Sequence, residues 1–304
     1  MDDDLNVTYI TLYGYVEMGT YRFFYFFIMF TVYILAMCFS VTIVYLICIH
    51  RNLHEPMYIF IAALLMNSIV YNTAMYPNLL YNILAKKHII SYSACLLQLF
   101  VFYSLSASDF FLLSAMAYDR YVSICKPLQY TTIMRKYTVT LILLLAWLVP
   151  FCELVVTVIL SADSKLCHLT LNAIFCNNLV YTLHCVTSRV QAMFDVFALL
   201  SMALFPLFFI YFTYIRILTI SYRSSREVRT KASQTCLPHV IVLSLFSCLC
   251  AYDVIISQMG SNIHFIMTFQ AFLYYPLFYP IIYGLKMKEI SKHIKRLFCQ
   301  AKLI

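Results

Sequence analysis

The chain contains few charged side chains, and this shortage excludes several kinds of protein. Only 11% of its 304 residues are charged and 63% are hydrophobic, whereas soluble domains average about 25% charged and 45–50% apolar residues. A soluble fold would therefore lack the polar residues that cover a surface, whereas a membrane solvates apolar faces directly. The net charge of +8 comes from bases in the loops between apolar runs, so no nucleic-acid partner is expected.

Glycine is scarce as well, with four residues in the whole chain. Transporters often contain inverted repeats and pairs of helices interrupted by glycine or proline, and this sequence shows no repeat, so a small transporter is kept only as an alternative. An enzyme would need a nucleophile and a base at one depth of the membrane, and the sequence offers no such constellation. Cysteine and histidine do not follow a zinc spacing, and we expect neither a cofactor nor a structural metal.

Long apolar runs dominate the sequence and predict an all-α membrane protein, a bundle of seven transmembrane helices. A spanning helix needs about 20 apolar residues, and the expected spans are 23–48, 53–81, 93–125, 138–160, 191–221, 231–259 and 264–285. The bundle (23–285) follows an N-terminal segment (1–22) and precedes a tail (286–304). The tail begins with a basic amphipathic stretch, for which we expect a short helix on the membrane surface.

Lysine and arginine predict the orientation of the bundle, because cytosolic loops carry more of them than loops on the other side. They gather after the first, third and fifth spans and in the tail. We therefore expect a multi-pass protein of the plasma membrane with a cytoplasmic C-terminus and an extracellular N-terminus. Asn6 in Asn6-Val7-Thr8 would then be a glycosylation acceptor.

Four cysteines fall on the expected extracellular side, where disulfides persist. Cys95 opens the third span, and Cys167, Cys176 and Cys185 lie in the long segment between the fourth and fifth spans. Four cysteines allow three pairings, and the residues by themselves do not choose among them.

The end of the third span carries the most distinctive motif, Asp119-Arg120-Tyr121, and Pro127 stops the helix soon after it. Removing an adjacent acid and base from water at the membrane boundary is energetically unfavourable. The pair therefore indicates a functional end of the helix that faces water. The surrounding stretch MAYDRYVSICKPLQY (116–130) resembles the end of the third helix in odorant receptors, a branch of the rhodopsin-like G-protein-coupled receptors. LHEPMY (53–58) and KASQTCLPH (231–239) resemble two further signatures of that family. The resemblance covers nearly the whole chain and is closest to the fish-type branch.

This resemblance implies a receptor that binds a small-molecule odorant and activates a stimulatory heterotrimeric G protein, which raises cyclic AMP. The alternative is a non-olfactory rhodopsin-like receptor for another small ligand, against which the second and third signatures argue. Disulfides Cys95–Cys176 and Cys167–Cys185 are implied. The residues implied in coupling and switching are Asp119, Arg120, Tyr121, Tyr214, His239 and Tyr283.

A ligand pocket is expected between the third, fifth, sixth and seventh helices, near their outer half. Phe102 stands where amine receptors carry an aspartate, which argues against an aminergic ligand at this place. Asp195, Asp253 and Arg189 lie near the outer ends, where they could meet a charged odorant or be solvated. The expected wall is apolar with a few hydroxyls, as is usual for small-molecule pockets, and consists of Phe102, Tyr103, Ser106, Ala107, Ala198, Met202, Cys250, Val254, Phe269 and Phe272.

Asp109 is an acid deep within the third span. It should face inward, because a charge on the lipid side costs at least about 2.5–3.5 kcal/mol. Odorant receptors often carry an acid here opposite an aspartate, a pair that resembles a sodium site, but this chain has Ser68 in place of the aspartate. Ser40 and Tyr279 replace two further conserved polar residues. We hypothesise that Asp109 is protonated, binds sodium weakly at most, and forms hydrogen bonds to Asn67, Ser68 or Tyr279.

Overall fold

The computed structural model describes residues 8–15, 21–186, 188–222, 236–237, 240–245, 247–248, 251, 272, 276–284 and 287–301. Within these residues, five helical segments are long and apolar enough to cross a membrane. They are α1 (Arg22–Ile49), α2 (Pro56–Leu84), α3 (Tyr92–Cys125), α5 (Lys136–Ala162) and a fifth span formed by α6 (Arg189–Leu199), the π-helix η5 (Leu200–Leu204) and α7 (Phe205–Tyr222). The predicted sixth and seventh spans lie largely outside the described residues, although 276–284 are helical.

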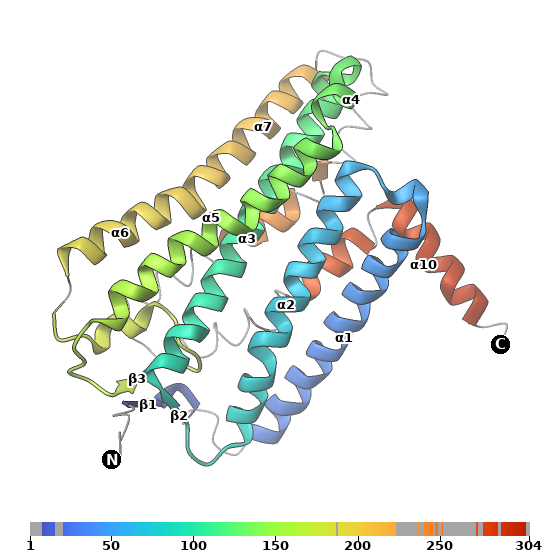
Figure 1. Ribbon diagram of the computed structural model, residues 1–304. Coiled ribbons are helices and arrows are strands. Elements are labelled where there is room, and N and C mark those ends of the chain that lie inside the picture. The colour runs from blue at the N-terminus through green and yellow to red at the C-terminus, as the bar shows by residue number, and fades with distance from the viewer. Residues whose placement is uncertain are drawn as a thin grey trace, which may run out of the picture.

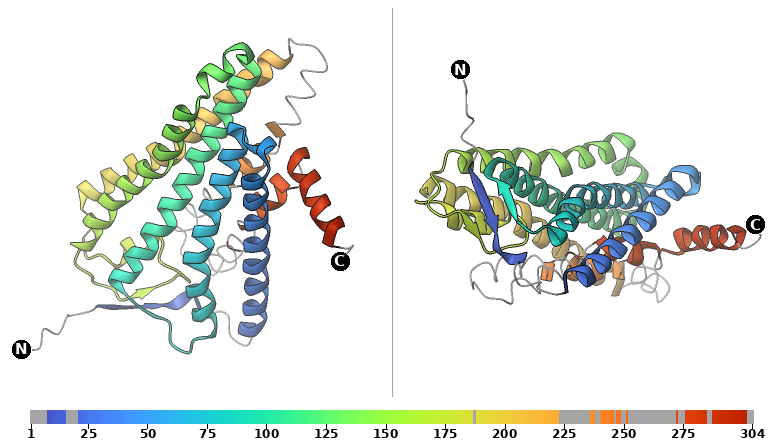
Figure 2. Two further views of the ribbon diagram at one scale, coloured as in Figure 1. Left: turned by 45° about the vertical axis from the view of Figure 1, so that its right-hand side comes forward. Right: turned by 90° about the horizontal axis from the view of Figure 1, so that it is seen from below.

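The spans run side by side, with α3 in the middle (Figures 1 and 2). Helix α3 packs against α2, α5 and α7, and α1 packs against α2. The short helix η2 (Arg51–Leu53) joins α1 to α2, while η3 (Pro127–Gln129) and α4 (Tyr130–Ile133) follow α3. Helix α10 (Lys288–Ala301) contacts the end of α1 and projects away from the bundle (Figure 2).

Local sequence signals explain where the helices begin and end. Pro56 occupies the first turn of α2, where its missing N–H costs nothing. Ser91 caps α3 by accepting a hydrogen bond from the backbone N–H of Ala94 at 3.3 Å. The same helix ends at Cys125, as predicted from Pro127.

A three-stranded sheet at one end of the bundle was not part of the all-α expectation. Strand β1 (Tyr9–Leu12) lies between β2 (Ile89–Ser91), with which it is antiparallel, and β3 (Thr170–Leu171), with which it is parallel. Ile10 and Leu12 are buried and alternate with exposed residues, which is the period of a strand that covers a core. We call this end of the bundle the sheet end and the opposite one the Arg120 end.

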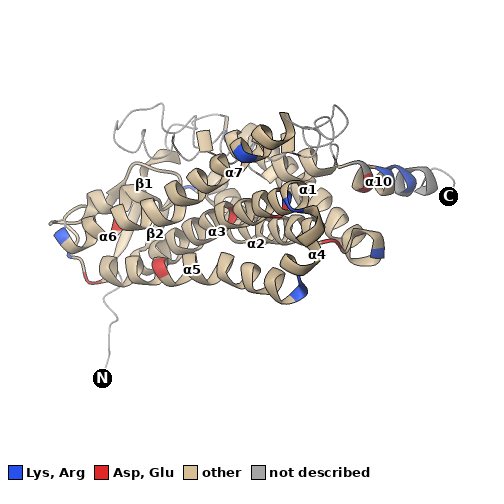
Figure 3. Ribbon diagram, turned by 90° about the horizontal axis from the view of Figure 1, so that it is seen from above, with Lys and Arg blue, Asp and Glu red and all other residues tan. Residues whose placement is uncertain are grey.

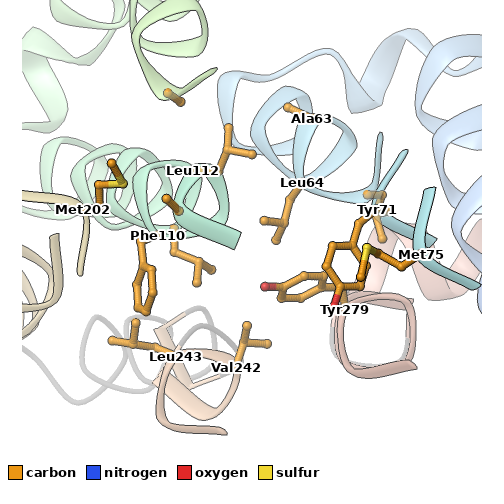
Figure 4. Close-up of a cluster of buried hydrophobic side chains, with 14 of the residues drawn as sticks. Ala63, Leu64, Tyr71, Met75, Phe110, Leu112, Met202, Val242, Leu243 and Tyr279 are labelled. Atoms are coloured by element: carbon orange, nitrogen blue, oxygen red, sulfur yellow. The ribbon is translucent and has the colours of Figure 1, made fainter. Parts of the chain in front are cut away.

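Several polar residues of the spans are buried while many apolar ones are exposed, which is the arrangement that lipid allows. In the fifth span only 17% of the most apolar window is buried, whereas Asn67, Ser68 and Asp109 are 0–2% exposed. Buried side chains of α2, α3 and η5 form part of the apolar core (Figure 4). Most of the ribbon in the spans is uncharged, while basic residues lie along α10 (Figure 3).

Candidate functional site

The Arg120 end holds an acid and a base that are neighbours in the chain. Asp119 is fully buried, and its Oδ2 accepts hydrogen bonds from Nε and Nη2 of Arg120 at 3.0 and 2.5 Å. Its Oδ1 accepts a third, at 2.8 Å, from the Tyr130 hydroxyl on α4. Burial, followed by the charge of Asp119, raises the pKa of Tyr130. Tyr130 is the last residue of the 116–130 motif, but sequence reasoning assigned it no role, because its partner lies eleven residues away around a turn.

Two buried tyrosines complete this end. Tyr214 on α7 is 5% exposed and Tyr283 in the helical residues 276–284 is fully buried. Both Tyr283 and Arg120 lie within electrostatic range of the Tyr214 hydroxyl. Tyr121 follows Arg120 in α3 and is partly buried. His239 lies outside the described residues, and the role of all six residues in switching stays a prediction.

Asp109 lies at the centre of a polar network that ties helices together in the middle of the bundle. Its Oδ1 accepts from Nδ2 of Asn67 at 2.7 Å, and its Oδ2 accepts from the Tyr279 hydroxyl at 3.1 Å. Nδ2 of Asn67 also donates to the Leu105 carbonyl at 2.8 Å, while its Oδ1 accepts from Nε1 of Trp147 at 3.1 Å. Asp109 therefore faces inward, as expected, and Asn67 joins α2 to both α3 and α5.

Of the three partners suggested for Asp109, Asn67 and Tyr279 contact it, whereas Ser68 accepts from Nδ2 of Asn72 at 3.5 Å. Because both carboxyl oxygens accept hydrogen bonds, neither contact requires a proton on the acid. The protonation of Asp109 and its weak binding of sodium stay predictions. Ser40 is buried, and its hydroxyl has no partner among the described residues.

The expected pocket wall is lined by aromatic rings, one of which comes from the long loop. The ring of Phe175 lies 4.7 Å from that of Phe102 and 5.1 Å from that of Phe272, between centroids. Tyr71 on α2 adds a ring 5.8 Å from Phe102. Sequence reasoning missed Phe175 and Tyr71. The signal for Phe175 was its place next to Cys176, which holds the loop against α3.

The remaining pocket residues are spread along three elements. The Tyr103 hydroxyl accepts from the backbone N–H of Asn178 at 3.2 Å, so the loop lies directly over this part of α3. Ser106 is half-buried and Ala107 is buried one residue further on. Ala198 on α6 is partly buried, and Met202 on η5 is buried with Phe110 (Figure 4). Three pocket candidates and the glycosylation site lie outside the described residues, namely Cys250, Val254, Phe269 and Asn6.

Both disulfides that the resemblance implies are present. Cys95 pairs with Cys176 across 81 residues, and Cys167 pairs with Cys185 across 18. Oε1 of Gln98 accepts from the backbone N–H of Cys176 at 3.1 Å, which adds a polar contact beside the first bond. The loop is thereby fixed onto α3 and closed on itself.

These features define a bundle of membrane-spanning helices, with an aromatic wall near one end and a buried ion pair at the other. Comparison with known proteins gives the family. Residues 29–301 match the model of the olfactory receptor family. Human olfactory receptor 6B1 is 31% identical over 311 residues, covering 99% of this chain and 98% of the relative. Human olfactory receptor 6N1 is 30% identical over 93% and 92% of the two chains, and the canine olfactory receptor-like protein OLF4 is 27% identical over 96% of each.

The chain belongs to the olfactory receptor family. It is a seven-transmembrane odorant receptor that acts through G-protein-coupled signalling, and it is not an enzyme. The two predicted spans that the structure describes only in part are accounted for by this assignment.

Proposed function

We propose that the chain binds a small apolar odorant against the aromatic wall and, when occupied, activates a stimulatory G protein at the Arg120 end. The rings of Phe102, Phe175 and Phe272 lie against one another in this wall, and we expect the Ser106 hydroxyl to face the same space. Such a surface suits a ligand that is mostly apolar and carries one polar group. We further propose that the protein lies in the plasma membrane with the sheet end outside, and that it belongs to the fish-type branch.

The coupling proposal depends above all on the pairing of Arg120 with buried Asp119. A buried charge is stable only while it is paired, and Arg120 is the one strong base within α3. The pair keeps the guanidinium away from a G protein in the resting state. An odorant that shifts the helices would release it, and Tyr130 would continue to satisfy Asp119 through its hydroxyl.

A panel of odorants with a cyclic-AMP readout in cells tests both halves of this proposal. Arg120→Ala should abolish the response to every odorant, with receptor still detected at the cell surface. Ser106→Val replaces the hydroxyl by two methyl groups, so it should reorder the active odorants rather than silence the receptor. A normal response from Arg120→Ala refutes the coupling role, and an unchanged order for Ser106→Val removes Ser106 from the pocket.

The polar core around Asp109 is the proposed link between the two ends. It lies in the same helix as the pocket wall and the switch, between Ser106 and Asp119. Its bonds to Asn67 and Tyr279 join α2, α3 and the helical residues 276–284. If the ligand displaces α2 or the helical residues 276–284, the hydrogen bonds of Asp109 should change first. The change should then pass along α3 to Arg120.

A further inference from the structure

A second group of polar side chains lies at the sheet end, apart from the aromatic wall. Hydrogen bonds and electrostatic contacts connect them beside the disulfide-bonded loop, where α3, α5, α6 and the short helix η4 (Asn178–Leu183) meet. We call this group the outer polar cluster, and it consists of Tyr92, Ser161, Tyr181, His184, Gln191 and Asp195.

The hydrogen bonds of Tyr92 fix the tautomer of His184. The Tyr92 hydroxyl donates its only proton to the backbone carbonyl of Ser161 at 2.7 Å. Nε2 of His184, 2.9 Å from the same hydroxyl, must therefore carry a proton and donate it. Burial lowers the pKa of His184, so the ring is neutral near neutral pH and its Nδ1 is an acceptor.

The carboxamide of Gln191 is fixed in the same way. The Ser161 hydroxyl donates its proton to the Thr157 carbonyl at 2.9 Å, so at 3.0 Å it can only accept from Nε2 of Gln191. Oε1 of Gln191 is then directed away from Ser161. Asp195 follows one helical turn later on the same face of α6, and its carboxylate faces the Tyr181 hydroxyl.

Two acceptors of the cluster are left without a donor, while the carboxylate of Asp195 has the Tyr181 hydroxyl beside it. Within the described part of the chain, Nδ1 of His184 and Oε1 of Gln191 have no hydrogen-bond partner, and the two residues are 8% and 1% exposed. Burying an acceptor without a donor is unfavourable, and the carboxylate of Asp195 adds a negative charge beside them. The nearby cationic residues Lys165 and Arg189 are both exposed.

We propose that the outer polar cluster is a second binding site, which takes the ammonium group of a small protonated amine. An ammonium group has three donors and no acceptor. It therefore offers one N–H each to Nδ1 of His184, Oε1 of Gln191 and the carboxylate of Asp195, together with the opposite charge. Hydrogen bonds to a carboxylate from an ammonium donor are among the stronger ones in proteins.

The cluster is connected to the pocket wall through η4. The first residue of this short helix, Asn178, donates to the Tyr103 hydroxyl, and His184 directly follows its last residue. An amine bound at one end of η4 would thus alter the contact at the other. We expect it to change odorant sensitivity without occupying the odorant pocket, which goes beyond the proposed function.

Thermal unfolding of the purified receptor tests binding without any odorant or G protein. Methylammonium should raise Tm by about 2 °C or more, with a rise that grows with its concentration. Tetramethylammonium carries the same charge but no N–H, and should give no rise. Equal shifts from both cations, or none from methylammonium, would overturn the proposal.

Variants of the cluster assign the effect to named atoms. Gln191→Met and Asp195→Asn should each reduce the methylammonium shift by more than half. His184→Phe keeps a ring in place but lacks the Nδ1 acceptor, so it should lose the shift, and its Tm without amine reports whether it folds. His168→Phe, at an exposed histidine of the same loop, is the matched control and should keep the shift. A full shift in all three cluster variants refutes the site while leaving the Arg120→Ala result untouched.

Discussion

The two ends of the bundle are held by different kinds of contact. At the sheet end two disulfides, a three-stranded sheet and the ring of Tyr15, stacked 4.7 Å from His88, fasten the N-terminal segment and the long loop to the helices. The Arg120 end is held by weaker contacts. Asp119 pairs with Arg120 and accepts a hydrogen bond from Tyr130, and the ring of His50 lies against that of His293. Covalent bonds and sheets persist while ion pairs exchange, so the sheet end is fixed and the Arg120 end is reversible.

The largest effect should come from breaking the covalent attachment at the sheet end. Closing a loop across 81 residues contributes about 4–5 kcal/mol in the chain-entropy account, against about 3 kcal/mol for one across 18. Cys95→Ser should therefore abolish cell-surface expression, and Cys167→Ser should reduce it less. Antibody labelling of intact cells measures both. Surface protein that carries a free Cys95 in the unaltered chain would contradict this prediction.

The next effect concerns the reversible end. Asp119→Asn removes the charge that holds Arg120, so basal cyclic AMP should rise more than tenfold. Tyr130→Phe loses a half-exposed hydrogen bond worth about 1 kcal/mol, so basal activity should rise about fivefold. Tyr137→Phe, on a residue 78% exposed at the start of α5, is the control. Basal activity in Tyr130→Phe no higher than in that control would show that the hydroxyl does not restrain the switch.

Two glycines allow a matched comparison of the ends. A Cβ at Gly14 would lie 2.7 Å from the backbone carbon of Ala173, whereas one at Gly284 would meet only the tips of Ile43 and Ile294 at 3.3 and 3.5 Å. Adding a methyl group to a packed site lowers the free energy of unfolding by about 1–3 kcal/mol. The backbone beside Gly14 cannot move aside, whereas the side-chain tips beside Gly284 can. Gly14→Ala should lower Tm by several degrees and Gly284→Ala by much less. The reverse order would mean that the sheet is the softer end.

The smallest effect is a pH dependence of the contact between α1 and α10. The rings of His50 and His293 lie 3.9 Å apart, and Nδ2 of Asn52 donates to Nε2 of His293 at 3.3 Å. Burial, followed by the charges of His50 and Arg296, lowers the pKa of His293 below its ordinary value of 6.5. When α10 is packed against α1, His293 therefore binds fewer protons than when the two helices are apart. The contact should be fully formed above pH 6.5 and should weaken as the pH falls.

Spin labels on α10 and on the end of α1 would measure this. The distance between them should increase as the pH falls below about 6, and His293→Phe should remove the pH dependence while keeping a ring in place. The charges of Glu289 and Lys292 also act on His293, but less than those of His50 and Arg296, so Lys292→Gln should shift the transition only slightly. A distance that is constant between neutral pH and about pH 5 would refute the effect.

Much of this architecture could be predicted from local sequence. The apolar runs located the five described spans within a few residues, because a bilayer imposes a length and a composition on each helix separately. Pro127 located the end of α3, and the signature motifs indicated the family and both disulfides. The inward position of Asp109 followed from the cost of a charge in lipid alone.

Tertiary structure decided what depends on two distant segments at once. Strand β1 has four residues and no partner nearby, and it exists because β2 and β3, about 80 and 160 residues further along, supply its hydrogen bonds. Phe175 reaches the pocket wall only because Cys176 is bonded to Cys95. Nδ1 of His184 and Oε1 of Gln191, which have no partner in the described part of the chain, become recognisable only when Tyr92 and Ser161 are placed beside them. A sequence determines the environment that each segment needs, but the pairing of polar groups depends on directions that only the packed chain defines.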